Sequence, residues 1–380
     1  AYGLTADAEI WPVAWAGVAA LIFRAFLMVD LENTRAACLV GRFTLLEGTQ
    51  YALSVFFGVV FIWWLGLRSA APLWGVALAN LLMVVAGIRF MMKRAGRFAP
   101  RKETLSAMAR YGVPLSLTMA LELVIAVSDR FFIGWFMDES AVGVYAVGYA
   151  LADRPLGILF TWVGMAVMPL AFAAMEREGP EAASDVIRGT AESLILIALP
   201  AAVGLAVVAK PLVAVLAGEA FRETAAQLIP WIALSGLMHG VMVHFAAMPF
   251  ALVKRNGLVF WTTAAAAVLN VVLNVVLIPR YGLMGAVAAT VASYILGAGL
   301  CVGIGARLIP LTIPWGSLFK GIAASACMAA GVIMADLPAS ALGLGAGIGL
   351  GMVIFAVCAY ALNLSNGRDK VHSALSRLRA

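Results

Sequence analysis

Five charged side chains interrupt apolar stretches of the chain and are the first candidates for chemistry. Asp129 and Arg130 stand side by side in "VIAVSDRFFIG" (124–134), and Glu122 precedes Asp129 by seven residues. Arg24 lies in "LIFRAFL" and Arg154 in "ALADRPLG". An ionised side chain at the centre of a bilayer costs about 2.5–3.5 kcal/mol, so such residues usually line a water-filled path, pair with one another or reach an interface.

The composition indicates a membrane protein with many spans. Of 380 residues, 63% are hydrophobic and 12% are charged, and the mean hydropathy is +0.99. A soluble domain carries about 25% charged residues. The four cysteines are widely separated, so we interpret them as small buried apolar residues and not as metal ligands or disulfides. In this context a net charge of +6 points to basic cytoplasmic loops and not to nucleic acid.

Apolar runs long enough to cross a bilayer predict the elements that position these charges. Eleven spans are expected: 10–29, 43–66, 72–92, 112–136, 143–172, 190–216, 225–250, 258–278, 283–306, 315–335 and 340–363. With the C-terminus in the cytoplasm, seventeen Lys and Arg residues lie in the inner loops and three in the outer loops. That asymmetry predicts a cytoplasmic C-terminus.

A weak internal repeat suggests how the spans are grouped. "PLWGVALAN" (72–80) resembles "GLMGAVAAT" (282–290), which aligns Gly75 with Gly285. The same offset carries the first three spans onto 225–250, 258–278 and 283–306, as in transporters with repeated halves. We therefore predict that the chain lacks the first three helices of its N-terminal lobe. The predicted domains are that remainder (1–92), a basic cytoplasmic loop (93–110), a six-helix C-terminal lobe (111–306), two further helices (307–363) and a basic cytoplasmic tail (364–380).

Four stretches resemble the polysaccharide-biosynthesis or oligosaccharide flippases of the multidrug/oligosaccharidyl-lipid/polysaccharide (MOP) exporter superfamily. They are "RYGVPLSL" (110–117), "SDRFFIGWFMDESAVGVYAVGYAL" (128–151), "MPLAF" (168–172) and "NVVLNVVLIPRYGLMGAVAATVASY" (270–294). The last is the most specific of the four. The resemblance implies an all-α membrane protein with two lobes around a central cavity, and the eleven spans fit the fourteen-helix form with three missing.

The resemblance also implies a function, which is export of an undecaprenyl-diphosphate-linked oligosaccharide across a bacterial inner membrane by alternating access. Such a flippase serves polysaccharide, lipopolysaccharide or O-antigen synthesis beside glycosyltransferases and a glycan polymerase. It is not an enzyme and needs no cofactor other than Na⁺ or H⁺ as a coupling ion.

An anionic diphosphate calls for fixed cations, and arginine supplies a planar set of donors that stays ionised. We expect Arg154 to face the substrate, or else to form an ion pair within the bundle. Arg24 is a second candidate, although its side chain could extend to the inner interface. Arg130 is a third, with the outer headgroups as its alternative partner.

The lipid II flippases of this superfamily have a sodium site, and the matching positions here are Asp129, Asn270, Asn274 and Thr290. One carboxylate, two amide carbonyls and a hydroxyl suit a monovalent cation, and Asn274 stands where an acid would strengthen the site. The asparagines could instead form interhelical hydrogen bonds. Glu122 is a candidate for proton coupling.

The sequence alone leaves other functions open. A cation-coupled multidrug antiporter of the same superfamily is expected to have an acidic, aromatic cavity, whereas three of the buried charges here are arginines. An integral membrane glycan polymerase or ligase usually carries a large extramembrane loop, and the outer loops here are short. A scaffold without transport activity would have little use for buried charges.

Overall fold

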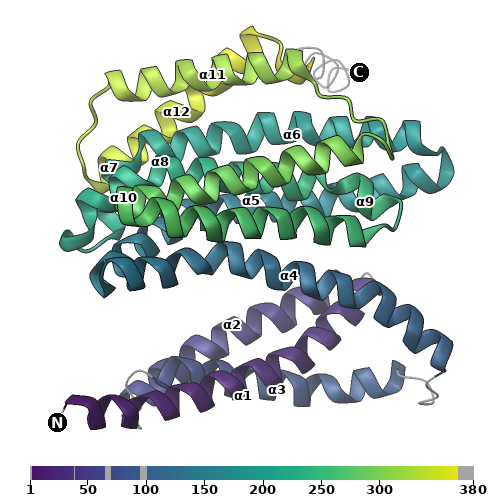
Figure 1. Ribbon diagram of the computed structural model, residues 1–380, viewed down its shortest axis with the longest axis vertical. Helices are drawn as coiled ribbons and strands as arrows, with labels where there is room; N and C mark the ends of the chain where they lie inside the picture. Colours follow the sequence, from purple (N-terminus) through teal and green to yellow (C-terminus); the bar gives the residue numbers. More distant parts are fainter. Residues whose placement is uncertain (1, 38, 65–69, 95–100, 367–380) are drawn as a thin grey trace, which may run out of the picture. The chain divides into compact units, whose positions relative to one another are not determined.

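The computed structural model describes residues 2–37, 39–64, 70–94 and 101–366, and all regular structure in these ranges is helical (Figure 1). Apolar segments in a bilayer must satisfy their backbone hydrogen bonds internally, which long helices do. The chain divides into two compact units, Ala1–Thr104 (unit 1) and Leu105–Ala380 (unit 2). The predicted tail beyond residue 366 lies outside the described residues.

Unit 1 consists of three long helices with α3 packed against both others. The helices are α1 (Tyr2–Ala36), α2 (Val40–Trp63) and α3 (Ala71–Arg94). The predicted loop 30–42 is therefore wrong in its bounds, because α1 continues to Ala36 and α2 begins at Val40. Charged residues end the apolar run near residue 29, but two of them are paired inside the unit, as described below.

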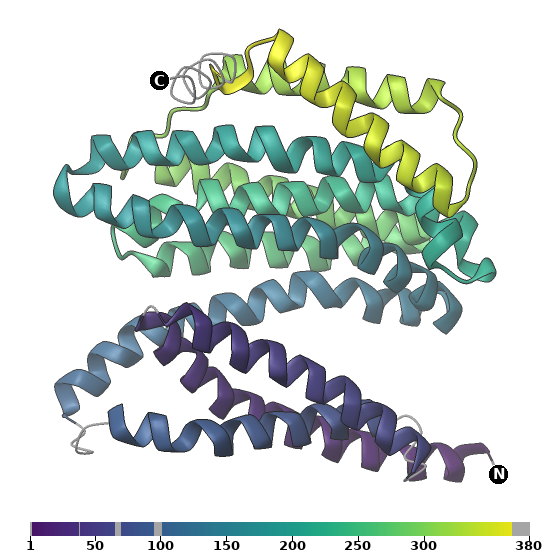
Figure 2. The same ribbon diagram turned by 180° about the vertical axis from the view of Figure 1, so that it is seen from behind.

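Unit 2 contains the remaining helices. They are α4 (Lys102–Phe136, which begins in the last residues of unit 1), α5 (Glu139–Arg177), α6 (Pro180–Val207), α7 (Ala209–Leu216), α8 (Glu219–Val241), the π-helix η2 (Met242–Ala246), α9 (Met248–Leu252), α10 (Asn256–Gly305), α11 (Trp315–Met334), α12 (Ala341–Ala361) and the short 3₁₀-helix η3 (Leu364–Asn366). Helix α8 packs on α5, α6 and α10, and the α11–α12 pair lies against α6 and α7 (Figure 2). The largest buried side chains come mainly from α4, α5, α6 and α8.

Several predicted span boundaries need correction. Helix α4 begins at Lys102, not near residue 112, so the end of the predicted 93–110 loop is helical. The predicted loop 173–189 is mostly helix, since α5 ends at Arg177 and α6 begins at Pro180. The predicted span 190–216 breaks after Val207, and α7 follows as a separate short helix.

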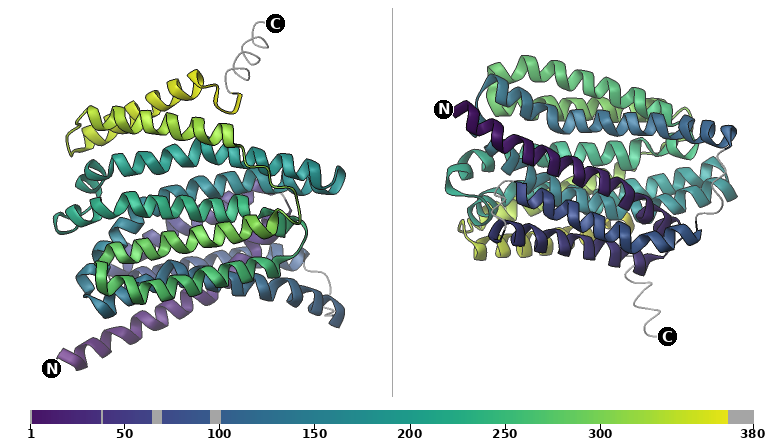
Figure 3. Two further views of the ribbon diagram at one scale, coloured as in Figure 1. Left: turned by 45° about the horizontal axis from the view of Figure 1, so that its top comes forward. Right: turned by 90° about the horizontal axis from the view of Figure 1, so that it is seen from below.

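Helix α10 contains two spans, because its backbone folds back at Gly282 (Figure 3). The φ angle of Gly282 is 57°, a conformation that residues with a Cβ rarely adopt, and Pro279 lies just before it. Ten helices among the described residues are long and apolar enough to cross a membrane. Counting α10 as two gives the eleven spans that the sequence predicts, and the all-helical membrane fold is confirmed.

The two glycines aligned by the internal repeat occupy similar places in their helices. A Cβ added to Gly75 in α3 would lie 2.5 Å from the backbone nitrogen of Gly58 in α2. One added to Gly285 would lie 2.3 Å from the carbonyl oxygen of Leu277, in the first half of α10. In both places a helix needs glycine to approach the backbone of the preceding helix.

Candidate ion-binding cluster

Asp129 is the centre of a buried polar cluster inside unit 2. Its side chain on α4 is fully buried. The carboxylate oxygen Oδ2 accepts a hydrogen bond from the hydroxyl of Tyr145 on α5. Thr290, in the second half of α10, donates its hydroxyl to the same oxygen at 3.5 Å. Three helices therefore converge on one carboxylate, which explains how an acid is accommodated in an apolar unit.

The two asparagines of α10 continue this network. Asn270 and Asn274 are fully buried and lie one turn apart, so their side chains share one face of the helix. The amide nitrogen of Asn274 donates to Oδ1 of Asn270 at 3.1 Å, and Asn270 reaches the hydroxyl of Thr290 at 3.4 Å. Ser128 on α4 donates to Oδ1 of Asn270 at 2.9 Å. The fold at Gly282 makes this possible, because it returns Thr290 to the level of the asparagines.

Two oxygens of the cluster are buried without a hydrogen-bond partner among the described residues. They are Oδ1 of Asp129 and Oδ1 of Asn274. A buried acceptor without a donor costs about 1–3 kcal/mol, and more when it is charged. Carboxylate, amide and hydroxyl oxygens are the ligands of hard cations. The residues present therefore fit a cation such as Na⁺, although the same side chains also form the interhelical hydrogen bonds of the alternative interpretation.

The described residues contain no group of three or more His, Cys, Asp or Glu side chains that could hold a metal ion together. With one carboxylate among neutral oxygens, the cluster suits a monovalent cation better than a transition metal. The structure thus brings together all four residues of the predicted sodium site.

Sequence reasoning missed the tyrosines of this cluster. Tyr145 and Tyr149 are buried one turn apart on α5, with ring centroids 5.6 Å from each other. Tyr149 interacts with Ser235 of α8 and with Tyr294 of α10. Tyrosine in an apolar helix is usually part of the core, and its spacing alone does not reveal that a hydroxyl meets a carboxylate. Only the placement of Tyr145 beside Asp129 in three dimensions shows it.

Arg130 turns toward the cluster. Its guanidinium carbon lies 5.4 Å from the ring centroid of Tyr149, a cation–π arrangement. The side chain is half-buried, and its Nε is buried without a hydrogen-bond partner among the described residues. This position gives Arg130 a contact inside unit 2 in addition to the substrate and headgroup roles considered from the sequence.

Arg154 lies apart from the cluster. Its side chain is exposed on the surface of α5, and its charge acts on the adjacent Asp153. The neighbouring Asp153 is half-buried and faces α8, where its Oδ1 lies 3.5 Å from the position that a Cβ on Gly236 would occupy. One turn of α5 therefore presents an acid inward and a cation outward. The predicted alternative for Arg154, a structural ion pair within the bundle, stays a prediction, since the charge of Arg154 acts on the adjacent Asp153.

The remaining candidates occupy separate places. Arg24 belongs to unit 1, where Nη1 donates to Oε1 of Gln50 on α2 at 3.5 Å. Glu122 is half-buried on α4, two turns before Asp129, and is close enough to Tyr294 to interact electrostatically. Among the described residues, the ring of His239 is tilted by 33° against that of Tyr294 with centroids 4.8 Å apart, and His244 stacks on the ring of Phe160.

Comparison with known proteins agrees with this architecture. A solved lipid II flippase, MurJ in an inward closed conformation, superimposes with a TM-score of 0.70 over 93% of this chain and 73% of its own, at 15% sequence identity. A curated relative from Haloferax volcanii, described as a probable low-salt glycan biosynthesis flippase, Agl15, is 27% identical over 167 residues. That alignment covers 44% of this chain and only 34% of Agl15, so the chain spans about a third of the relative it matches.

A family model described as polysaccharide biosynthesis protein matches residues 6–226, which is more than half of the chain. The match includes α1 to α5, with Asp129, Arg130 and Arg154. By this match, the chain is a member of the polysaccharide biosynthesis protein family.

Proposed function

We propose that this chain is part of a flippase that carries a lipid-linked oligosaccharide from the cytoplasmic to the outer leaflet, with undecaprenyl diphosphate as the lipid carrier. The chain is a multi-pass membrane protein of a polysaccharide biosynthesis family, and its fold resembles that of a lipid II flippase. The proposed location is a bacterial inner membrane with the C-terminus in the cytoplasm, and the proposed pathway is polysaccharide or O-antigen synthesis.

Arg154 is the observation that supports this function most. A guanidinium exposed on a membrane helix can bind a diphosphate in two-point fashion. Arg24 offers a second cation in unit 1, positioned by Gln50. An anionic substrate explains these arginines better than the cationic drug of a multidrug antiporter does.

The membrane potential favours export of the anion. Moving one negative charge out of an inside-negative cell gains about 2.3 kcal/mol per 100 mV. We propose Na⁺ as the coupling ion, held by Asp129, Asn270, Asn274 and Thr290. The two buried oxygens without donors support this assignment, and a bound cation would supply the positive charge that they lack. Alternating access follows from the family resemblance.

The experiment that tests this function is translocation in vesicles. The chain is reconstituted with a radiolabelled undecaprenyl-diphosphate oligosaccharide, and the flipped fraction is measured with a membrane-impermeant glycosidase. We expect Arg154→Ala to reduce the rate to below about a tenth and Arg154→Lys to restore only part of it, because lysine lacks the planar fork.

A matched control is Arg188→Ala. Arg188 is also exposed on a helix of unit 2, but it forms a surface pair with Glu192 at 3.7 Å, and its loss should leave the rate within twofold. Full activity of Arg154→Ala at equal protein density would remove Arg154 from the substrate path. Failure of the unaltered chain to move the lipid would count against the function itself.

A further inference from the structure

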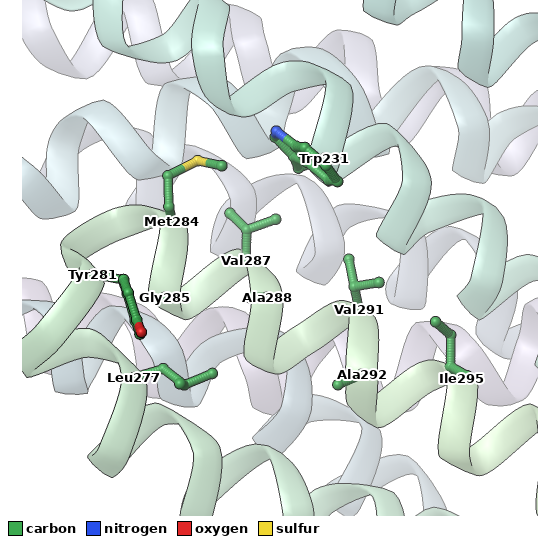
Figure 4. A pocket seen from close by; sticks show the side chains of 10 residues that line it. All are labelled: Trp231, Leu277, Tyr281, Met284, Gly285, Val287, Ala288, Val291, Ala292 and Ile295. Carbon is green, nitrogen blue, oxygen red and sulfur yellow. The ribbon is translucent and has the colours of Figure 1, made fainter.

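An apolar groove opens on unit 2 between α8 and the two halves of α10 (Figure 4). Its volume is about 500 Å³, within the range of small-molecule pockets. Trp231 of α8 lies across from Val287, and Leu277, Met284, Val291 and Ile295 are also part of the lining. Trp231 and Ile295 are about half exposed, so the groove is accessible from the surface of the unit.

The groove has the length of one bilayer leaflet. Its lining follows the second half of α10 from Met284 to Ile295, which is about 16 Å at 1.5 Å per residue. The hydrocarbon core of a bilayer is about 30 Å thick, so one leaflet accounts for about 15 Å. A single extended hydrocarbon chain that starts at the turn of α10 would therefore end near the middle of the membrane.

An aromatic side chain lines the groove at that turn, and a cation precedes it in the chain without being part of the lining. Tyr281 lines the groove and is 66% exposed, as is common for tyrosine at the level of lipid headgroups. The adjacent Arg280 is exposed and makes no hydrogen bond or ion pair with the described residues. An arginine in this position can bind a phosphate. The apolar lining of the groove matches the acyl chain of a phospholipid, and the cation beside its end matches the phosphate of the headgroup.

We propose that this groove binds one phospholipid, with an acyl chain against Trp231 and Val287 and its phosphate at Arg280. The proposal does not depend on the transported substrate. The opposite face of the same stretch of α10 carries Thr290 and Tyr294, both buried in the polar cluster. A lipid in the groove would pack against the outer face of α10 at the height of Thr290 and Tyr294.

Photolabelling tests the occupant directly. The purified chain in detergent is mixed with phosphatidylglycerol that carries a photoreactive group in its acyl chain, and adducts are mapped by mass spectrometry. We expect adducts within residues 277–295 and at Trp231. Arg280→Gln should raise the half-saturating lipid concentration about fivefold, the effect of one basic residue at a lipid surface. Ala288→Trp should fill the groove and abolish this labelling.

The matched control is Ala265→Trp. Ala265 lines a second apolar groove with Trp261 and Val268. No charged residue lies between Asn256 and Pro279, so this stretch of helix offers no cation to a phosphate. Filling the second groove should therefore leave the labelling at 277–295 unchanged. Undiminished labelling of a monodisperse Ala288→Trp protein would overturn the proposal, and so would an unchanged half-saturating concentration for Arg280→Gln. Stronger competition by undecaprenyl phosphate than by unlabelled phosphatidylglycerol would assign the groove to a polyprenyl chain. Loss of labelling as the protein self-associates would assign it to a second copy of the chain.

Discussion

Among the described residues, each unit buries one carboxylate completely, and the surroundings of the two carboxylates differ. In unit 1, Asp30 of α1 is bound by Arg42 of α2, whose Nη2 donates to both carboxylate oxygens at 3.2 and 2.9 Å. The guanidinium carbon of Arg42 also lies 3.3 Å from the ring centroid of Phe90 on α3. In unit 2, the side-chain donors to Asp129 among the described residues are the neutral hydroxyls of Tyr145 and Thr290, and its Oδ1 has no side-chain partner there.

This difference distinguishes a carboxylate that stabilises the fold, Asp30, from one that is a candidate for ion binding, Asp129. A carboxylate paired with arginine has its charge compensated by the protein, and Gly87 makes room for it, since a Cβ there would lie 2.2 Å from Oδ2 of Asp30. Breaking such a buried pair is costly, which makes it a device for holding three helices together. Asp129 accepts no hydrogen bond from a charged side chain, although the charge of the adjacent Arg130 acts on it, and its Oδ1 has no partner among the described residues. We propose that a cation from solution completes its surroundings. Unit 1 thus has an ion pair within the protein, and unit 2 has the proposed ion site.

Removing Arg42 should have the largest effect. Arg42→Ala leaves Asp30 buried without its cation, and we expect a loss of about 3–5 kcal/mol in unfolding free energy. Thermal unfolding of the purified protein measures it. Arg89→Ala, which removes an exposed arginine of α3, is the control and should change stability by no more than about 0.5 kcal/mol. Equal effects of the two variants would show that the Asp30–Arg42 pair is not a structural element.

Neutralising Asp129 should abolish the response to sodium while leaving the fold intact. At a sodium concentration of 100 times the dissociation constant, binding stabilises the folded state by about 2.7 kcal/mol. We expect the melting temperature of the unaltered chain to rise when NaCl replaces choline chloride at constant ionic strength. Asp129→Asn should show no such rise. A sodium-dependent rise that survives in this variant would place the ion elsewhere.

Tyr145→Phe removes the hydroxyl that donates to Asp129 and should weaken sodium binding about tenfold, as loss of a ligand-orienting hydrogen bond commonly does. Sodium titration of the melting temperature gives the apparent affinity. Tyr281→Phe, at an exposed position of α10, is the matched control and should leave that affinity unchanged. An unchanged affinity in Tyr145→Phe would mean that the tyrosine only fills space.

Asn274→Asp should have the smallest effect and the opposite sign. It places a second carboxylate where a buried amide oxygen has no donor, which should tighten sodium binding. The gain should be less than about tenfold, because the new charge also repels Asp129. The same titration measures it, and weaker binding than in the unaltered chain would indicate that Asn274 serves the hydrogen-bond network alone.

The helices and four residues of the candidate site could be predicted from sequence for identifiable reasons. Long apolar runs determine the spans, and the "NVVLNVVLIPRYG" pattern places two asparagines on one helix face before a turn. The family resemblance supplied their partner Asp129 on α4. The structure then brings Asp129, Asn270, Asn274 and Thr290 into one hydrogen-bonded network.

The Asp30–Arg42 pair could not be predicted, because both residues lower the local hydropathy and appear to end the neighbouring spans. Their pairing within unit 1 compensates both charges. Tyr145 was missed for a different reason, since its role depends on which helix α5 faces and not on its own neighbours. Local composition reveals neither pairing between helices.

Direct binding of radioactive sodium to the purified chain tests the contrast between the two carboxylates most directly. The account predicts one saturable site per chain, lost in Asp129→Asn and retained in Asp30→Asn. Equal binding by all three proteins, or no saturable binding by the unaltered chain, would contradict it.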